Sequence, residues 1–143
     1  MSINVLVSVA SAQRYEEGNS ERMEFTTEGT LHHRGGVYTI IYRDTEVTGI
    51  AGVTTSLKVE PAKVTLNRMG AVDHRQVFEK GRRHGSPYVT AQGALFFEID
   101  TEDMEINLTE QGGNITLEYN LFSDEQLVSH NSLRINIKED APR

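Results

Sequence analysis

The chain has 143 residues, 37% of them hydrophobic, and it contains no cysteine. This length fits one domain over residues 1–143 with a sizeable core, while the lack of cysteine excludes disulfides and cysteine nucleophiles and fits a cytoplasmic protein. The 21 acidic residues outnumber the 14 Lys and Arg residues, and the resulting net charge of −7 disfavours nucleic acid as a partner.

Apolar and polar residues alternate from the N-terminus onward, and this pattern predicts β-strands. In the first strand Ile3, Val5 and Val7 share one face. Gly35-Gly36 is the signature of a tight hairpin, and a short helical turn is predicted over 46–51. The expected strands of this half of the chain cover residues 3–13, 23–31, 37–44, 53–59, 64–69 and 72–79.

The segment 86–101 is predicted to form the longest strand, with a bend at Gly93 that helps a sheet to close. The basic segment 81–85 is expected to precede it as a loop, and the acidic segment 101–104 to follow it as a turn. Gly112-Gly113 predicts another hairpin. The last strands are expected over 104–108, 115–121 and 127–138.

These strands are short, mostly connected by hairpins, and accompanied by no long helical stretch that could cover a sheet. Closure into a barrel would remove the exposed edges of such a sheet. We therefore predict an all-β fold, a closed antiparallel up-and-down β-barrel of about 8–10 strands. No run approaches the roughly 20 apolar residues of a membrane-spanning helix.

Five short motifs between residues 27 and 121 occur in a recognisable order and spacing, and the likeness that they mark runs from Val5 to Glu139. They are TxGxL at 27–31, RxG at 68–70, Phe78, YxTxxG at 88–93 and GGxIxLxYxL at 112–121. In these motifs the chain resembles the YwiB-like family of uncharacterised bacterial proteins. The resemblance implies a calycin-like barrel, related in shape to lipocalins, which commonly hold a small apolar or amphipathic molecule. The family has no assigned activity, so the resemblance implies no catalytic residues.

Alternation places several polar side chains inside such a barrel. Arg68 continues the inward face of Leu66, and Gln76 continues that of Phe78. A buried Arg without a partner is costly, so Arg68 either anchors the carboxylate of a ligand or is turned outward by a bulge before Gly70. The candidate ligand-binding residues, in the interior or at its rim, are Arg68, Gln76, Tyr88, Tyr119 and Asn131.

The segment 81–88 concentrates positive charge. Arg82, Arg83 and His84 form either an anion-binding rim or an ordinary solvated loop. His84 and Ser86 lack the G-x-S-x-G motif of a hydrolase. The five histidines match no zinc signature, so neither a metal nor a cofactor is expected.

The leading functional hypothesis is a non-enzymatic binder of a small amphipathic molecule inside the barrel. The alternative is a structural or interaction protein with a packed core, which meets a protein partner through its charged surface. An enzyme of unknown type is the third hypothesis, since no catalytic motif is present.

Overall fold

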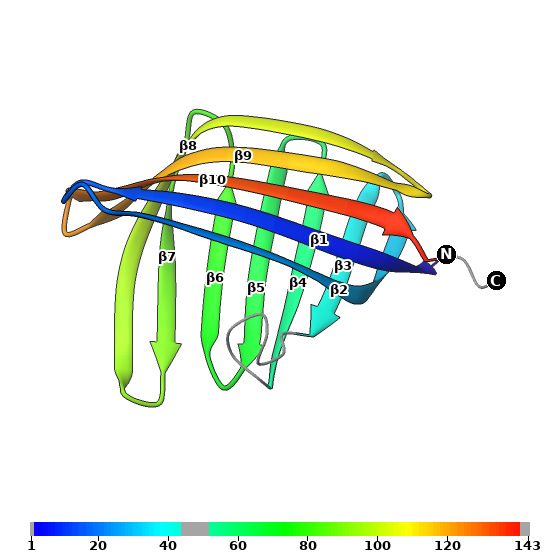
Figure 1. The fold of residues 1–143 in the computed structure, drawn as a ribbon, viewed down its shortest axis with the longest axis horizontal. Coiled ribbons are helices and arrows are strands. Elements are labelled where there is room, and N and C mark those ends of the chain that lie inside the picture. The colour runs from blue at the N-terminus through cyan, green and yellow to red at the C-terminus, as the bar shows by residue number, and fades with distance from the viewer. Residues whose placement is uncertain (1, 44–51, 141–143) are drawn as a thin grey trace.

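The computed structural model describes residues 2–43 and 52–140, which form a closed antiparallel barrel of ten β-strands (Figure 1). The predicted helical turn over 46–51 lies outside the described residues. Consecutive strands are neighbours, and β1 pairs with β10 to close the barrel, so the predicted all-β up-and-down barrel is confirmed. The strands are β1 Ser2–Tyr15, β2 Ser20–Arg34, β3 Val37–Arg43, β4 Val53–Glu60, β5 Lys63–Gly70, β6 Asp73–Phe78, β7 Arg83–Thr90, β8 Gly93–Thr109, β9 Gly112–Ser123 and β10 Gln126–Glu139.

The barrel has two layers whose strands cross steeply. In Figure 1, β1, β2, β9 and β10 run across the front, while β3 to β7 run behind them from top to bottom. Two long strands belong to both layers. Residues 20–32 of β2 pair with β1 and residues 29–34 with β3, while residues 93–100 of β8 pair with β7 and residues 98–109 with β9. These two strands therefore form the corners of the barrel.

The interior is filled along much of its length by one apolar cluster. Its members come from the inward faces of the strands, as period-two alternation requires. No member is more than 9% exposed. The cluster comprises Val5, Val7, Val9, Phe25, Leu31, Ile40, Tyr42, Leu57, Val59, Val64, Leu66, Phe78, Ile99, Ile115, Leu117, Ile135 and Ile137.

The prediction of one long strand over 86–101 is wrong. The chain turns at Ala91-Gln92, and Thr90 pairs with Gly93 across the end of the β7–β8 hairpin. Gly93 has φ +138° but opens β8 instead of bending it. The alternation continues on both sides of this two-residue turn, so the sequence pattern resembles one unbroken strand.

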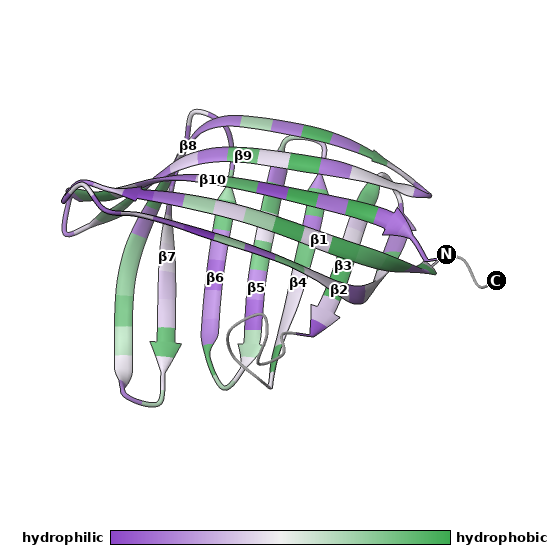
Figure 2. Ribbon diagram, viewed as in Figure 1, coloured by the Kyte–Doolittle hydropathy of each residue, from purple (hydrophilic) through white to green (hydrophobic). Residues whose placement is uncertain are grey.

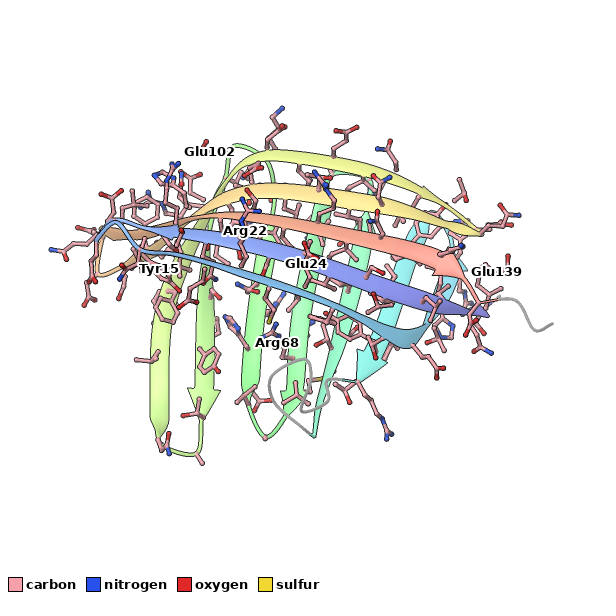
Figure 3. All side chains as sticks on the ribbon, in the orientation of Figure 1. Tyr15, Arg22, Glu24, Arg68, Glu102 and Glu139 are labelled. Carbon is pink, nitrogen blue, oxygen red and sulfur yellow. The ribbon has the colours of Figure 1, made fainter. Side chains whose placement is uncertain are left out.

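The acidic segment 101–104 is not a turn either. It lies within β8, where the register with β9 shifts between Thr101 and Asp103. The extra residue is Glu102, labelled at the corner of the barrel in Figure 3. A bulge of this kind bends a strand and strengthens its twist. The bend predicted at Gly93 is therefore provided instead by the bulge at Glu102.

Of the two hairpin turns predicted at Gly-Gly pairs, one forms at the predicted residues and the other does not. Gly35 and Gly36 have φ +60° and +79° and form the tip of the β2–β3 hairpin, as predicted. By contrast, Glu110-Gln111 forms the tip of the β8–β9 hairpin, while Gly112-Gly113 begins β9. The predicted loop over 81–85 is also shorter than expected, because β7 already begins at Arg83.

Candidate functional site

Arg68 lies in a row of cross-strand partners that runs across five strands of the rear layer. The register pairs Tyr42 with Thr55, Thr55 with Arg68, Arg68 with His74, and His74 with Tyr88. Directly opposed residues present their side chains on the same face of a sheet. Since Tyr42 and Thr55 are buried, this face is the interior one. Arg68 thus lies on the inward face, between Thr55 and His74.

The guanidinium of Arg68 is only partly solvated. Its Nε atom is buried, and it has no hydrogen-bond partner among the described residues. In Figure 3, Arg68 lies on β5 below the edge of β2, in a part of the rear layer that the front layer leaves uncovered in this view. After burial, its positive charge is the second cause of the lowered pKa of His74, and it opposes the burial that raises the pKa of Tyr119. Arg68 therefore acts electrostatically on side chains of both β6 and β9.

His74 is held in one tautomer by its neighbour on β7. The Ser86 hydroxyl donates to the backbone oxygen of Arg75 at 2.8 Å, and its oxygen lies 3.1 Å from Nε2 of His74. Ser86 has only one hydroxyl proton, so Nε2–H must be the donor and Nδ1 carries a lone pair. This Nδ1 is buried and lacks a hydrogen-bond partner within residues 2–43 and 52–140. The Tyr88 ring packs edge-on against the His74 ring, with centroids 4.6 Å apart.

Burial and Arg68 both disfavour a charged His74. Burial is the larger cause, and together they lower the pKa of His74 from 6.5 to about 4. The imidazole is consequently neutral at pH 7. The site therefore presents one cation beside one uncharged acceptor.

Tyr119 forms another part of the site from β9. Its side chain hydrogen-bonds with Gln76, and burial raises the pKa of Tyr119 to about 12 despite the opposing effects of Arg68 and Gln76. The Phe78 ring packs against the Tyr119 ring at 4.8 Å in a T-shaped arrangement. Thr101, the cross-strand partner of Tyr119, has a buried Oγ1 that no described group hydrogen-bonds. Polar groups from β5, β6, β8 and β9 thus share this interior region.

Asn131 lies beside these polar groups, but its side chain hydrogen-bonds with Ser129 on the same strand. It pairs with Tyr119 in the β9–β10 register. Its side-chain nitrogen donates to Oγ of Ser129 at 3.1 Å, and Ser129 donates to Oδ1 of Asn131 at 3.3 Å. The structure therefore brings Arg68, Gln76 and Tyr119 into direct electrostatic or hydrogen-bonding contact, whereas the Asn131 amide hydrogen-bonds with Ser129.

The three candidates for an anion-binding rim, Arg82, Arg83 and His84, have partners within the protein. Glu79 lies 3.9 Å from Nε of Arg82 and 3.0 Å from Nε2 of His84. The Arg83 guanidinium lies over the Phe122 ring, 4.0 Å from its centroid. Part of the positive charge of this segment is therefore compensated within the protein.

Replacing Arg82 and Arg83 with Ser is expected to change the free energy of unfolding by less than about 1 kcal/mol, because exposed ion pairs and exposed cation–π contacts contribute little. The thermal midpoint of the double variant checks this prediction. A collapse of the fold would show instead that these side chains belong to the barrel architecture.

His74 was not among the residues selected from the sequence. The sequence pattern does indicate that His74 points inward, because it lies at an alternating position with Gln76 and Phe78. Its importance, however, depends on Arg68, Ser86 and Tyr88, which are distant in the sequence or on other strands. Only the register between β5, β6 and β7 brings them to it.

Five pockets are lined by described residues of the front layer and its turns, with volumes between about 230 and 640 Å³. The pocket of about 390 Å³ lies over β1, β2, β9 and β10 and has lining residues of both charges, including Arg14, Glu21 and Arg22. Arg68 lines none of these five. In the described part of the chain, no three His, Asp or Glu side chains are placed to hold a metal ion, and no helix is long and apolar enough to cross a membrane.

Comparisons with known proteins agree with the resemblance noted in the sequence. Residues 7–135 match the family model described as a domain of unknown function, DUF1934. The chain is 30% identical over 118 residues to the "uncharacterized beta-barrel protein YwiB" of Bacillus subtilis (strain 168), covering 81% of each chain. The crystal structure of the ywiB protein from Bacillus subtilis has a TM-score of 0.87 at 23% identity and covers 98% of this chain and 94% of its own.

Proposed function

The chain belongs to the DUF1934 family, a domain of unknown function, and from its interior we propose that it is a non-enzymatic binder of a small amphipathic acid. In this proposal the acidic group lies on Arg68 and the apolar part lies among the aliphatic side chains of the barrel. Small β-barrels that are not completely filled can hold one small ligand in this way.

The observation that carries the proposal is the buried Nε of Arg68, which no group in residues 2–43 or 52–140 hydrogen-bonds. An unpaired donor on a cationic group costs more than an unpaired neutral amide, because the charge itself loses hydration. A bound carboxylate would supply both the acceptor and the opposite charge. Arg is suited to this role, since its planar guanidinium can bind a carboxylate through two parallel hydrogen bonds.

The surrounding residues would complete the site. Gln76 and Tyr119 already hydrogen-bond each other, and they would orient the head group beside Arg68. Tyr88 packs on His74 and would cover the apolar part of the ligand. Asn131 lies next to Tyr119 in the register and would need to release Ser129 to take part.

Replacing Arg68 with Leu is expected to weaken the binding of a fluorescent fatty acid by at least about 10- to 100-fold, because it removes the charge-assisted hydrogen bonds to the carboxylate, each of which contributes roughly 1.5–3 kcal/mol. The barrel should remain folded with equal or greater stability, because the substitution removes a partly buried charge. Fluorescence titration measures the affinity, and urea unfolding measures the stability.

Arg75→Leu provides the matched control. Arg75 lies on β6 next to His74, but its side chain is exposed, so its loss removes one positive charge from the protein without touching the interior. Its affinity for the probe should equal that of the parent. Equal affinities for the parent and Arg68→Leu would show that Arg68 is no anchor, and a parent that binds no fatty acid would overturn the proposed function.

A second candidate function, the docking of a protein partner on the outer surface, is favoured by the β7–β8 hairpin. Val89 on β7 and Leu95 and Phe96 on β8 are 44%, 58% and 63% exposed, and Figure 2 shows hydrophobic segments, in green, toward the lower ends of these two strands. Native mass spectrometry of protein from its own host separates the two candidates. A small-molecule adduct that Arg68→Leu loses supports the binder, whereas a protein partner that Phe96→Ser loses and Arg68→Leu keeps supports docking.

An enzyme is the least supported candidate. His74 and Ser86 are the one His–Ser pair with a hydrogen bond among the described residues. Since the Ser86 hydroxyl donates to the backbone oxygen of Arg75, its proton does not point to the imidazole as a nucleophile requires.

A further inference from the structure

We propose that the Arg68–His74 pair takes up one proton together with the acidic group that it binds, so that ligand uptake is coupled to pH. This inference rests on the proposed function and deepens it. It names the ligand class as an acid that binds against a cation and a protonatable ring at the same time.

The Arg68–His74 pair presents one hydrogen-bond donor and one acceptor that no described residue uses. Arg68 and His74 are direct cross-strand partners on the inward face, so their Cβ atoms lie about 5 Å apart. Arg68 offers a buried N–H donor, while His74 offers a buried lone pair on Nδ1, because Nε2–H is used by Ser86. Nε of Arg68 is a donor and Nδ1 of His74 is an acceptor, yet the two atoms form no hydrogen bond with each other.

A bound anion changes the balance of donors and acceptors at this pair. A carboxylate or sulfonate oxygen placed against Arg68 accepts from Nε, but it also brings its lone pairs next to the lone pair of Nδ1. Two acceptors in one partly buried space repel each other. A proton on Nδ1 converts this repulsion into a charge-assisted hydrogen bond, so the stable complex contains one more proton than the free partners.

The charges around the imidazole of His74 set the pH at which it takes up a proton. Arg68 faces His74 from β5, and Ser86 and Tyr88 face it from β7, while Tyr119 on β9 interacts with Arg68 and is neutral, with a pKa raised to about 12. Arg68 is therefore the charged member of this group at neutral pH. It contributes, after burial, to a His74 pKa of about 4 in the free protein. A bound anion cancels the charge of Arg68 and adds an opposite one, and both changes raise the pKa of His74.

The sign of the coupling follows from these two states. Between a pKa of about 4 in the free protein and the higher pKa in the complex, the complex holds more protons than the free protein. The affinity must then rise as the pH falls through that window, by at most tenfold per pH unit for one proton. Above the pKa of the complex the affinity is independent of pH.

Isothermal titration calorimetry with decanesulfonate tests the coupling, because a sulfonate does not titrate and any proton taken up belongs to the protein. Titrations near pH 6 in two buffers of different ionisation enthalpy give the number of protons. We expect uptake of about 0.5 to 1 proton per site and an affinity that rises several-fold from about pH 7 to about pH 5. Decanol, whose hydroxyl can both accept from Arg68 and donate to Nδ1 of His74, should bind without proton uptake.

His74→Gln is the decisive variant. The Gln side chain can still donate to Ser86, but it cannot take up a proton, so the variant should bind decanesulfonate with no proton uptake and no affinity change over the same pH range. A second readout needs no variant: the ring nitrogen signals of His74 in the parent should change from the neutral to the protonated form when decanesulfonate is added near pH 6.

The outcomes separate the two proposals. Binding of decanesulfonate by the parent without proton uptake, or with uptake that His74→Gln retains, overturns the coupling and leaves the binding function standing. If the parent binds none of decanesulfonate, decanol and the fluorescent fatty acid, both the proton coupling and the binding function are overturned.

Discussion

Gly113→Ala is expected to lower the free energy of unfolding by about 2–5 kcal/mol, combining the strain of a left-handed backbone with that of overpacking. Gly113 has φ +145° and lies in β9, paired with Leu108 on one side and Ile137 on the other. A Cβ atom there would lie 1.9 Å from the backbone oxygen of Asn107. A backbone oxygen within a paired strand cannot move aside as a flexible side chain can, so the β8–β9 ladder must distort.

Gly93→Ala is the matched control, because Gly93 has nearly the same backbone conformation, φ +138°, but a Cβ there meets no described atom within 4 Å. It should lose about 1–2 kcal/mol, the cost of the strained backbone alone. Urea unfolding of both variants gives the comparison. If the two variants were equally stable, the close approach of the β8 backbone would not be what requires glycine at position 113.

The barrel could be predicted from the sequence because its determinants are local. Alternation along strands such as β1 and β10 fixes the inward face of each strand without knowledge of its neighbours, and Gly35-Gly36 fixes its hairpin by backbone conformation alone. The errors arose where the pattern does not change at the structural boundary. Around Ala91-Gln92 the alternation continues through the turn, and around Glu102 one extra residue is absorbed by a bulge within a continuous strand.

For the candidate site, the inward direction of the side chains could be predicted from the sequence, but their neighbours on other strands could not. The inward direction of Arg68 follows from Leu66 two residues earlier, and that of Gln76 from Phe78. What surrounds these side chains depends on the register between strands, which the pattern of a single strand does not contain. The position of His74 beside Arg68 follows from the register of the β5–β6 hairpin. The contact between Gln76 and Tyr119 joins β6 to β9, which are not neighbouring strands, and it follows from the closure of the barrel.

Phe78→Ala is expected to lower the free energy of unfolding by about 3–5 kcal/mol, the usual cost of removing a fully buried phenylalanine. Phe78 is 0% exposed, and it packs against the Tyr119 ring with the centroids 4.8 Å apart. The loss combines the apolar area returned to water with a cavity that the closed barrel cannot easily collapse. Urea unfolding monitored by circular dichroism measures it.

Phe96→Ala is the matched control, since it makes the same substitution on a ring that is 63% exposed. That ring lies over Gly85, where an added Cβ would come within 2.7 Å of Cζ of Phe96, so its removal should still cost up to about 1 kcal/mol of local packing. The difference between the two variants isolates interior packing from the general effect of losing an aromatic ring. If Phe78→Ala were no more destabilising than Phe96→Ala, the interior around Tyr119 would be adaptable enough to refill the space. The Gln76–Tyr119 contact would then be free to rearrange, and Arg68 would lose the fixed surroundings on which its role as an anchor depends.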